Sequence, residues 1–140
     1  LFGGGLSLAA QISSSGLGIW IGESLIVLSN IPPILLIMAV ATLIIFLTEI
    51  TSNVTTTTTF LPVFGGVAIA IGILPVSLAI PVCLAASCAF MLPVATPPNA
   101  IVYGSNKFTI ATMMRAGFAL NIIGIIVVTL FSYFLAPMIF

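Results

Sequence analysis

The sequence predicts an all-α, polytopic membrane fold in which a re-entrant helical hairpin and a discontinuous helix precede a full-length span. Of the 140 residues, 61% are apolar and only 3% are charged, whereas a soluble domain averages about 25% charged residues. A surface built from two acidic and two basic residues cannot face water all round, so lipid must be the main solvent. Prolines and polar clusters interrupt the apolar runs, and helices break at such places.

Residues 1–33 are expected to hold the end of one span, a connector and an interfacial helix. The chain opens at Leu1 with no initiator Met and no basic segment, so we expect a longer protein rather than a signal peptide. Leu6–Ala10 is apolar, and Gln11–Gly18 is rich in Ser and Gly, as connectors are. Trp20–Leu28 places Trp and Glu among apolar residues, which suits a helix at the membrane surface.

Residues 34–74 are predicted to form the re-entrant hairpin. Ile34–Leu47 is almost uninterruptedly apolar, but 14 helical residues rise only about 21 Å, less than the roughly 30 Å hydrocarbon core. Thr48–Thr59 is a polar, hydroxyl-rich island, and Phe60–Leu74 is a second short apolar run. Two short arms around a polar tip predict a hairpin that enters and leaves by one face. Non-helical backbone at membrane depth needs burial in protein or a cavity.

Residues 77–103 are predicted to form a broken helix. Ser77–Ala95 would be about 28 Å long if helical. Two adjacent prolines follow in Thr96–Asn99, and they remove two amide donors and clash with the preceding turn. The helix must therefore break there, and Ala100–Tyr103 resumes it briefly.

Residues 104–140 predict how the chain is oriented in the membrane. Residues 104–116 are predicted to be a turn and a short amphipathic piece, Phe108–Arg115, and residues 117–140 the last transmembrane helix, about 36 Å long if wholly helical. The only two basic residues, Lys107 and Arg115, lie in the first of these segments. The positive-inside rule places that segment in the cytoplasm, so the hairpin is expected to enter from the outer face.

The chemistry is expected at the two polar breaks. Unwound backbone exposes carbonyl oxygens, which suit an alkali cation, and half-helix N-termini, which suit a carboxylate. Interrupted helices of this kind mark the site in many secondary transporters. The chain has no His and no CxxC pair, so a metal other than sodium is not expected. Its net charge of zero gives no reason to expect a nucleic-acid partner.

Each polar feature also has a structural interpretation. The Pro97-Pro98 pair could be a packing kink, and the hydroxyls of Thr55–Thr59 are best interpreted as bonded back to helix carbonyls. Glu49 could belong to a functional site, as intramembrane acids often do, or could structure the tip in a neutral or water-reached form. Cys83 and Cys88 are interpreted as small apolar fillers.

The run from Ala86 to Val102, ASCAFMLPVATPPNAIV, resembles the signature of the divalent anion:sodium symporter (DASS) family, which includes the sodium-coupled citrate, dicarboxylate and sulfate carriers. Phe2–Gly5 and Thr48–Asn53 resemble the second half of that family as well. The resemblance covers essentially the whole chain and implies the C-terminal third of a member. It further implies the second of two inverted repeats, an elevator mechanism, a homodimer when full length, and a missing N-terminal half with a matching hairpin. A multi-pass protein of the plasma (inner) membrane is expected.

The resemblance also implies the site residues. Substrate would be contacted by Ser52, Asn53, Val54 and Pro97, and sodium by Thr48, Ser52, Asn53, Ala95, Thr96 and Asn99. Val54 departs from the family, whose tip usually has Thr, because Val cannot donate a hydrogen bond. One carboxylate contact is then lost or taken over by Thr55, which leaves the choice of dianion open.

The function expected is sodium-coupled uptake of a C4-dicarboxylate such as succinate or malate, or of citrate, with sodium as the co-transported ion and lipid as the surroundings. The alternatives within transport are a sodium-independent dicarboxylate exchanger and a sulfate transporter. Other classes are a non-transporting subunit or sensor, and an apolar packing subunit. We do not expect an enzyme or any catalytic residue, because no base lies near Ser52 in the sequence.

Overall fold

The computed structural model describes residues 7, 11, 14–16 and 31–135. Over these residues the predicted all-α fold is confirmed, with elements α3 (Pro33–Thr48), α4 (Asn53–Ala70), α5 (Val76–Ala85), α6 (Pro97–Gly104), α7 (Ile110–Leu130) and a π-helical turn, η2 (Phe131–Leu135). The predictions for residues 6–10, for the connector 11–18, for the interfacial helix 20–28 and for the last span beyond residue 135 lie wholly or mostly outside the described residues.

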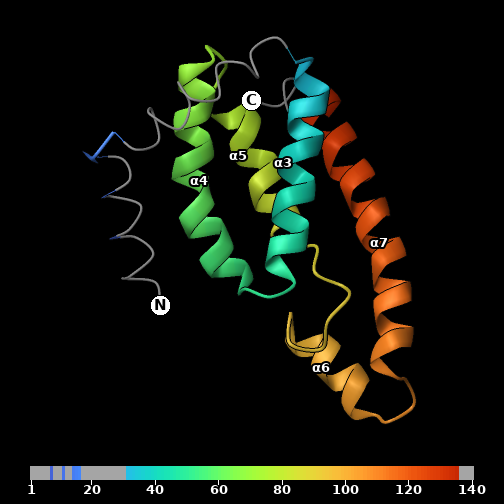
Figure 1. Cartoon of the computed structure of the whole chain (residues 1–140). Helices are drawn as coiled ribbons and strands as arrows, with labels where there is room; N and C mark the ends of the chain where they lie inside the picture. The colour runs from blue at the N-terminus through green and yellow to red at the C-terminus, as the bar shows by residue number, and fades with distance from the viewer. Residues whose placement is uncertain (1–6, 8–10, 12–13, 17–30, 136–140) are drawn as a thin grey trace.

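Helices α3 and α4 run antiparallel and are joined by a short tip, Glu49–Ser52 (Figure 1). Helical rise makes them about 24 and about 27 Å long, both shorter than the roughly 30 Å hydrocarbon core. Helix α4 begins at Asn53, whereas an arm from Phe60 was predicted. The prediction of a long polar tip is wrong, because the Thr hydroxyls bond to carbonyls of their own helix and are thus satisfied without leaving it.

Three of these threonines make such hydrogen bonds within α4. The hydroxyl of Thr56 donates to the carbonyl of Ser52 at 3.0 Å, and that of Thr57 donates to Asn53 O at 2.9 Å. The hydroxyl of Thr58 reaches Val54 O at 2.8 Å. The structural interpretation of this run is therefore confirmed at these positions.

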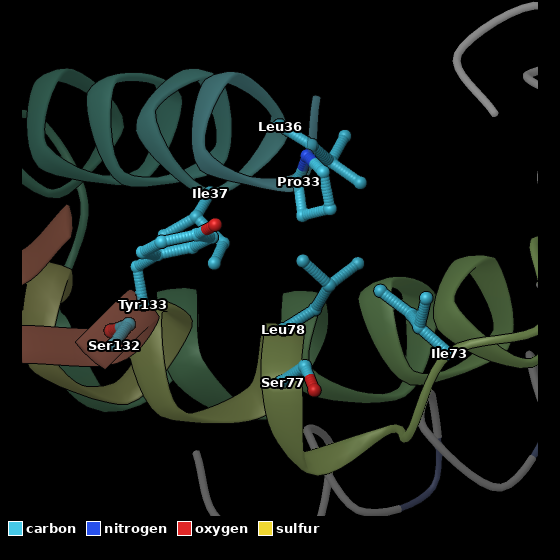
Figure 2. A pocket seen from close by; sticks show the side chains of 8 residues that line it. All are labelled: Pro33, Leu36, Ile37, Ile73, Ser77, Leu78, Ser132 and Tyr133. Carbon is cyan, nitrogen blue, oxygen red and sulfur yellow. The ribbon is translucent and has the colours of Figure 1, made fainter. Parts of the chain in front are cut away.

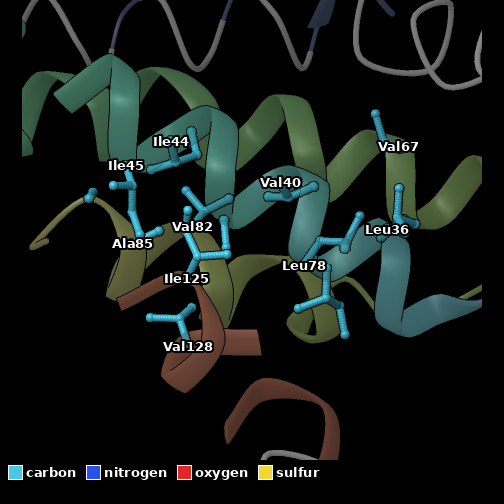
Figure 3. Packing of buried hydrophobic residues seen from close by; sticks show 14 residues of the cluster. Leu36, Val40, Ile44, Ile45, Val67, Leu78, Val82, Ala85, Ile125 and Val128 are labelled. Carbon is cyan, nitrogen blue, oxygen red and sulfur yellow. The ribbon is translucent and has the colours of Figure 1, made fainter. Parts of the chain in front are cut away.

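The core is built around α5, which packs against both arms of the hairpin and against α7 (Figure 3). In α3 the buried positions recur at helical spacing and form one apolar stripe. The buried aliphatic residues of the cluster are Leu36, Ile37, Val40, Ala41, Ile44, Ile45, Val67, Ala68, Leu78, Val82, Ala85, Ala86, Ile125 and Val128. The hairpin, α5 and α7 therefore share one core.

Helix α5 ends at Ala85, ten residues before the predicted end at Ala95. Non-helical backbone, here called the break, runs from Ala86 to Thr96, and α6 then starts with Pro97 at its first position. Helix α6 has no buried residue, and it lies at the end of the molecule where α3 and α4 are joined (Figure 1). The break therefore begins well before the prolines that predicted it.

Helix α7 is continuous from Ile110, so the prediction of a separate amphipathic piece ending at Arg115 is wrong. The side chain of Thr109 accepts from the amide of Thr112 and caps the start of the helix, and no proline interrupts the helix as far as Leu130. The 26-residue stretch Ile110–Leu135 contains an 18-residue window with a mean hydropathy of 2.3, so it is long and apolar enough to cross a membrane.

Candidate functional site

The hairpin tip and the break face each other across an open cleft of about 410 Å³, here called the tip–break cleft. Its size lies within the range of small-molecule sites. The tip with the start of α4 contributes Ile50, Thr51, Ser52 and Asn53, and the break with the start of α6 contributes Val94, Ala95, Thr96 and Pro97. Five predicted site residues thus line one cleft, namely Ser52, Asn53, Ala95, Thr96 and Pro97.

The lining of the tip–break cleft carries no charged side chain. Its positive potential must come from backbone, because the first amides of α4, those of Asn53, Val54 and Thr55, have no intrahelical acceptor. The start of α6 offers fewer donors, since Pro97 and Pro98 have no N–H. A carboxylate can therefore be bound from the α4 side, with the ring of Pro97 on the opposite side of the cleft.

Thr48 lies directly behind the tip and is fully buried. Its hydroxyl is 2.8 Å from Asn53 Oδ1 and 3.0 Å from the carbonyl oxygen of Ala86. A hydroxyl has a single proton, so three oxygens share one hydrogen. This leaves spare lone pairs beside the tip, and oxygen lone pairs are what an alkali cation needs.

Two predicted site residues are placed differently. Asn99 does not line the tip–break cleft, and its side-chain Nδ2 donates to the carbonyls of Ala89 (2.9 Å) and Leu92 (3.0 Å), so it holds the break together. Val54 lies on the first turn of α4, 42% exposed and outside the lining residues.

Glu49, the first residue of the tip, is 3% exposed and points into the break. Its carboxylate accepts five hydrogen bonds, all between 2.8 and 3.1 Å. The amides of Phe90 and Leu92 donate one each, the amide of Met91 donates to both oxygens, and Asn121 Nδ2 donates the fifth. All of these donors are N–H groups, the pattern of an ionised carboxylate. Of the two interpretations left open by the sequence, these contacts support a structural role for Glu49.

The sequence interpretation missed two residues of α7 that support the break. Asn121 is fully buried against Glu49, and as an amide within an apolar span it gave a signal that could have found it. Gly117 packs so closely that a Cβ there would come within 3.0 Å of backbone atoms of Phe90 and Met91. Nothing in the sequence around Gly117 indicates that contact.

A second, smaller hollow of about 150 Å³ lies at the other end of α3 (Figure 2). Its lining is apolar apart from two serines and the hydroxyl of a tyrosine, and consists of Pro33, Leu36, Ile37, Ile73, Ser77, Leu78, Ser132 and Tyr133. The first turns of α3 and α5 meet there, but most of the side chains that they contribute are aliphatic. The tip–break cleft is therefore the better candidate for an ionic ligand.

Two interrupted helical elements that meet at an uncharged, oxygen-rich cleft are the arrangement in which many secondary membrane transporters build their binding sites. The chain belongs to the sodium:sulfate symporter family, since the model of the "Sodium:sulfate symporter transmembrane region" matches residues 1–140. This membership confirms the resemblance to the DASS family. It places the chain in an integral membrane protein, and it agrees with the expectation that the protein is a transporter and not an enzyme.

Curated relatives are similar over nearly the whole chain. The sodium-dependent dicarboxylate transporter SdcS of Staphylococcus saprophyticus is 46% identical over 137 residues, which is 98% of this chain and 26% of that protein. SdcS of Staphylococcus aureus strain MRSA252 is 46% identical over 139 residues, 99% of this chain and 27% of that protein. The chain thus spans about a quarter of the length of these relatives.

Proposed function

We propose that the full-length protein takes up a small dicarboxylate together with sodium across the inner membrane, and that this chain carries half of the binding site. The observation that carries the proposal is the tip–break cleft, in which a helix N-terminus and exposed carbonyls meet without a cationic side chain. The substrate expected is a C4-dicarboxylate such as succinate or malate, or citrate.

The carboxylate is assigned to the α4 side of the cleft. The free amides at the start of α4, the hydroxyl of Ser52 and the side-chain amide of Asn53 are hydrogen-bonding groups suited to it. Pro97 borders the substrate from the opposite wall. Because the side chain of Val54 has no donor and Val54 is not among the lining residues, only its backbone amide can contact substrate in this proposal.

Sodium is assigned to the oxygens around the tip and the break. Thr48, Asn53 and the carbonyl of Ala86 form an oxygen cluster with one shared proton, and Ser52, Ala95 and Thr96 add oxygens at the cleft. Asn99 contributes by holding the break in place. A dianion that enters a cleft without cationic side chains needs a cation to offset its charge, which favours symport over exchange.

Movement of the whole site is consistent with the packing. Both arms of the hairpin, α5 and α7 share one core, so the tip–break cleft can travel as part of one body. We therefore propose an elevator step against a scaffold that belongs mainly to the missing N-terminal part. Such a scaffold would carry the dimer contacts of a multi-pass homodimer.

The comparisons support dicarboxylate over sulfate. The family description mentions sulfate, but the two relatives that are 46% identical are named as sodium-dependent dicarboxylate transporters. Competition separates the two substrates, since excess sulfate should leave succinate uptake unchanged in a dicarboxylate carrier.

Uptake of labelled succinate into vesicles that contain the full-length protein tests the proposal. Replacing external sodium with choline should abolish uptake, and Asn53→Ala should reduce it by at least tenfold, a loss of about 1.4 kcal/mol. Asn106→Gly is the matched control, because it removes an exposed amide in the loop after α6 and suits the positive φ of that residue. Uptake that ignores sodium but requires internal dicarboxylate would identify an exchanger instead.

A further inference from the structure

We propose, on the basis of the proposed function, that Glu49 is the positioning residue of the transport site and that Asn121 holds it in place. In this arrangement the Glu49 carboxylate contacts neither sodium nor substrate. It sets the path of the break, and therefore the distance between the two walls of the tip–break cleft.

The geometry begins with three consecutive amides of the break. Glu49 Oε1 accepts from Phe90 N at 2.8 Å and from Met91 N at 2.9 Å, while Oε2 accepts from Met91 N at 3.1 Å and from Leu92 N at 3.0 Å. Successive amides that converge on one anion form a strong concave binding element. The side chain of the tip is thus the ligand that shapes the break.

These bonds explain why the break exists where it does. Helix α5 ends at Ala85, and the amides of residues 90–92 are directed to the carboxylate rather than to helix carbonyls. A buried amide without an acceptor is costly. A charged acceptor therefore favours the unwound path over continuation of α5, upstream of both Pro97 and Pro98.

The carboxylate is itself fixed from α7. Asn121 Nδ2 donates to Glu49 Oε1 at 2.8 Å, and both side chains are buried. One turn earlier, Gly117 lets the backbone of Phe90 and Met91 approach α7 without a side chain in between. The tip, the break and α7 are therefore joined at one point.

Direct binding of sodium by Glu49 does not fit these contacts. Both carboxylate oxygens already accept N–H donors, and Glu49 is absent from the residues that line the tip–break cleft. The residue after it in the chain, Ile50, does line the cleft. Glu49 consequently acts through the backbone on either side of the cleft.

The test uses the full-length protein and two variants, Glu49→Gln and Asn121→Ala. The amide of Gln cannot accept on both atoms, so part of the contact to residues 90–92 is lost. We expect the sodium and succinate concentrations for half-maximal uptake to rise about tenfold in both variants, as for the loss of other groups that orient ligands, at unchanged amounts in the membrane. In Glu49→Gln, adding Asn121→Ala should change these values little further, because the two residues act as a unit.

Thr129→Val is the matched control on α7. Thr129 is also buried and polar, but its hydroxyl has no partner within the described part of the chain, so half-maximal concentrations should stay at the wild-type value. If Asn121→Ala also leaves them unchanged while Glu49→Gln raises them, Glu49 is a direct ligand and the proposal is wrong. Unchanged values in both variants, or effects on protein amount alone, would equally overturn it.

Hydrogen exchange separates this inference from the proposed function. Amides 90–92 should be protected in the wild-type protein and should lose protection in Glu49→Gln, whether or not the protein transports succinate. Retained protection would refute the positioning role. A wild-type protein with protected amides but no sodium-dependent uptake would refute the proposed function alone.

Discussion

The hydroxyl of Thr48 connects two segments at the candidate site. It lies one residue before Glu49 at the end of α3, fully buried, and its single proton is shared between a side-chain oxygen of the tip and a carbonyl of the break. Its hydroxyl therefore orients the Asn53 side chain and joins the start of α4 to the start of the break.

Thr48→Val tests this link with almost no change in shape. The variant leaves buried oxygens without their shared proton, which costs about 1 kcal/mol or more, so the sodium concentration for half-maximal uptake should rise about fivefold. Thr42→Val is the control, because the Thr42 hydroxyl bonds only back along α3, to Met38 O at 2.7 Å. Equal sodium dependence in the two variants would contradict the assignment of Thr48.

Prediction of single residues from sequence succeeded where the type of the side chain alone indicates a binding role. Ser52, Asn53 and Thr96 are polar groups at helix interruptions, and the structure places all three in one cleft. Their roles as ligands stay predictions. The role of Glu49 could not be decided from sequence, because its partners lie 41 to 72 positions away in the chain.

The break is the element that sequence placed least well. Pro97 and Pro98 correctly indicate that a helix must start or stop nearby, and α6 does begin at Pro97. Pro93 disfavours helix over the few residues directly before it, but it lies eight positions after Ala85 and does not by itself end α5 there. The amides of residues 90–92 bond to the carboxylate of Glu49, which belongs to another element, and no local propensity contains that contact.

Close packing between the break and α7 makes a prediction at this scale. Gly117→Ala places a methyl group against rigid backbone of Phe90 and Met91, and such overpacking costs about 1–3 kcal/mol. The full-length variant should melt at a lower temperature and bind sodium more weakly.

Gly65→Ala is the matched control for that experiment. Gly65 lies inside α4 with open space around its Cα, so alanine should be neutral or stabilising by up to about 1 kcal/mol. Equal melting temperatures for the two variants would show that the break does not press on α7 at Gly117.

The whole chain presents more apolar surface than its own core can cover. Exposed large apolar residues line much of α7, including Phe118, Ile123, Ile126 and Val127, and the chain spans about a quarter of its relatives. Lipid and the remainder of the protein are the surroundings that such a surface requires.

The isolated chain should therefore insert into membranes without transporting. The described chain supplies two walls of the tip–break cleft, and the proposed inverted repeat would supply the other half of the site. Vesicles with the chain alone should take up succinate no faster than empty vesicles, while vesicles with the full-length protein should show sodium-dependent uptake. Sodium-dependent uptake by the chain alone would overturn the half-site proposal.

Sequence alone determined that lipid surrounds the chain, that the fold is all-α, that two polar segments interrupt the helices, and which family the chain belongs to. Composition and local residue types encode all of these. Tertiary structure decided where α5 ends, which polar residues line the cleft, and what Glu49 does. Each of these depends on contacts between segments distant in the chain: Glu49 with residues 90–92, Asn121 with Glu49, and Gly117 with the break. Hydrogen-bond partners and close backbone approach exist only once the elements are packed, so no local pattern can specify them.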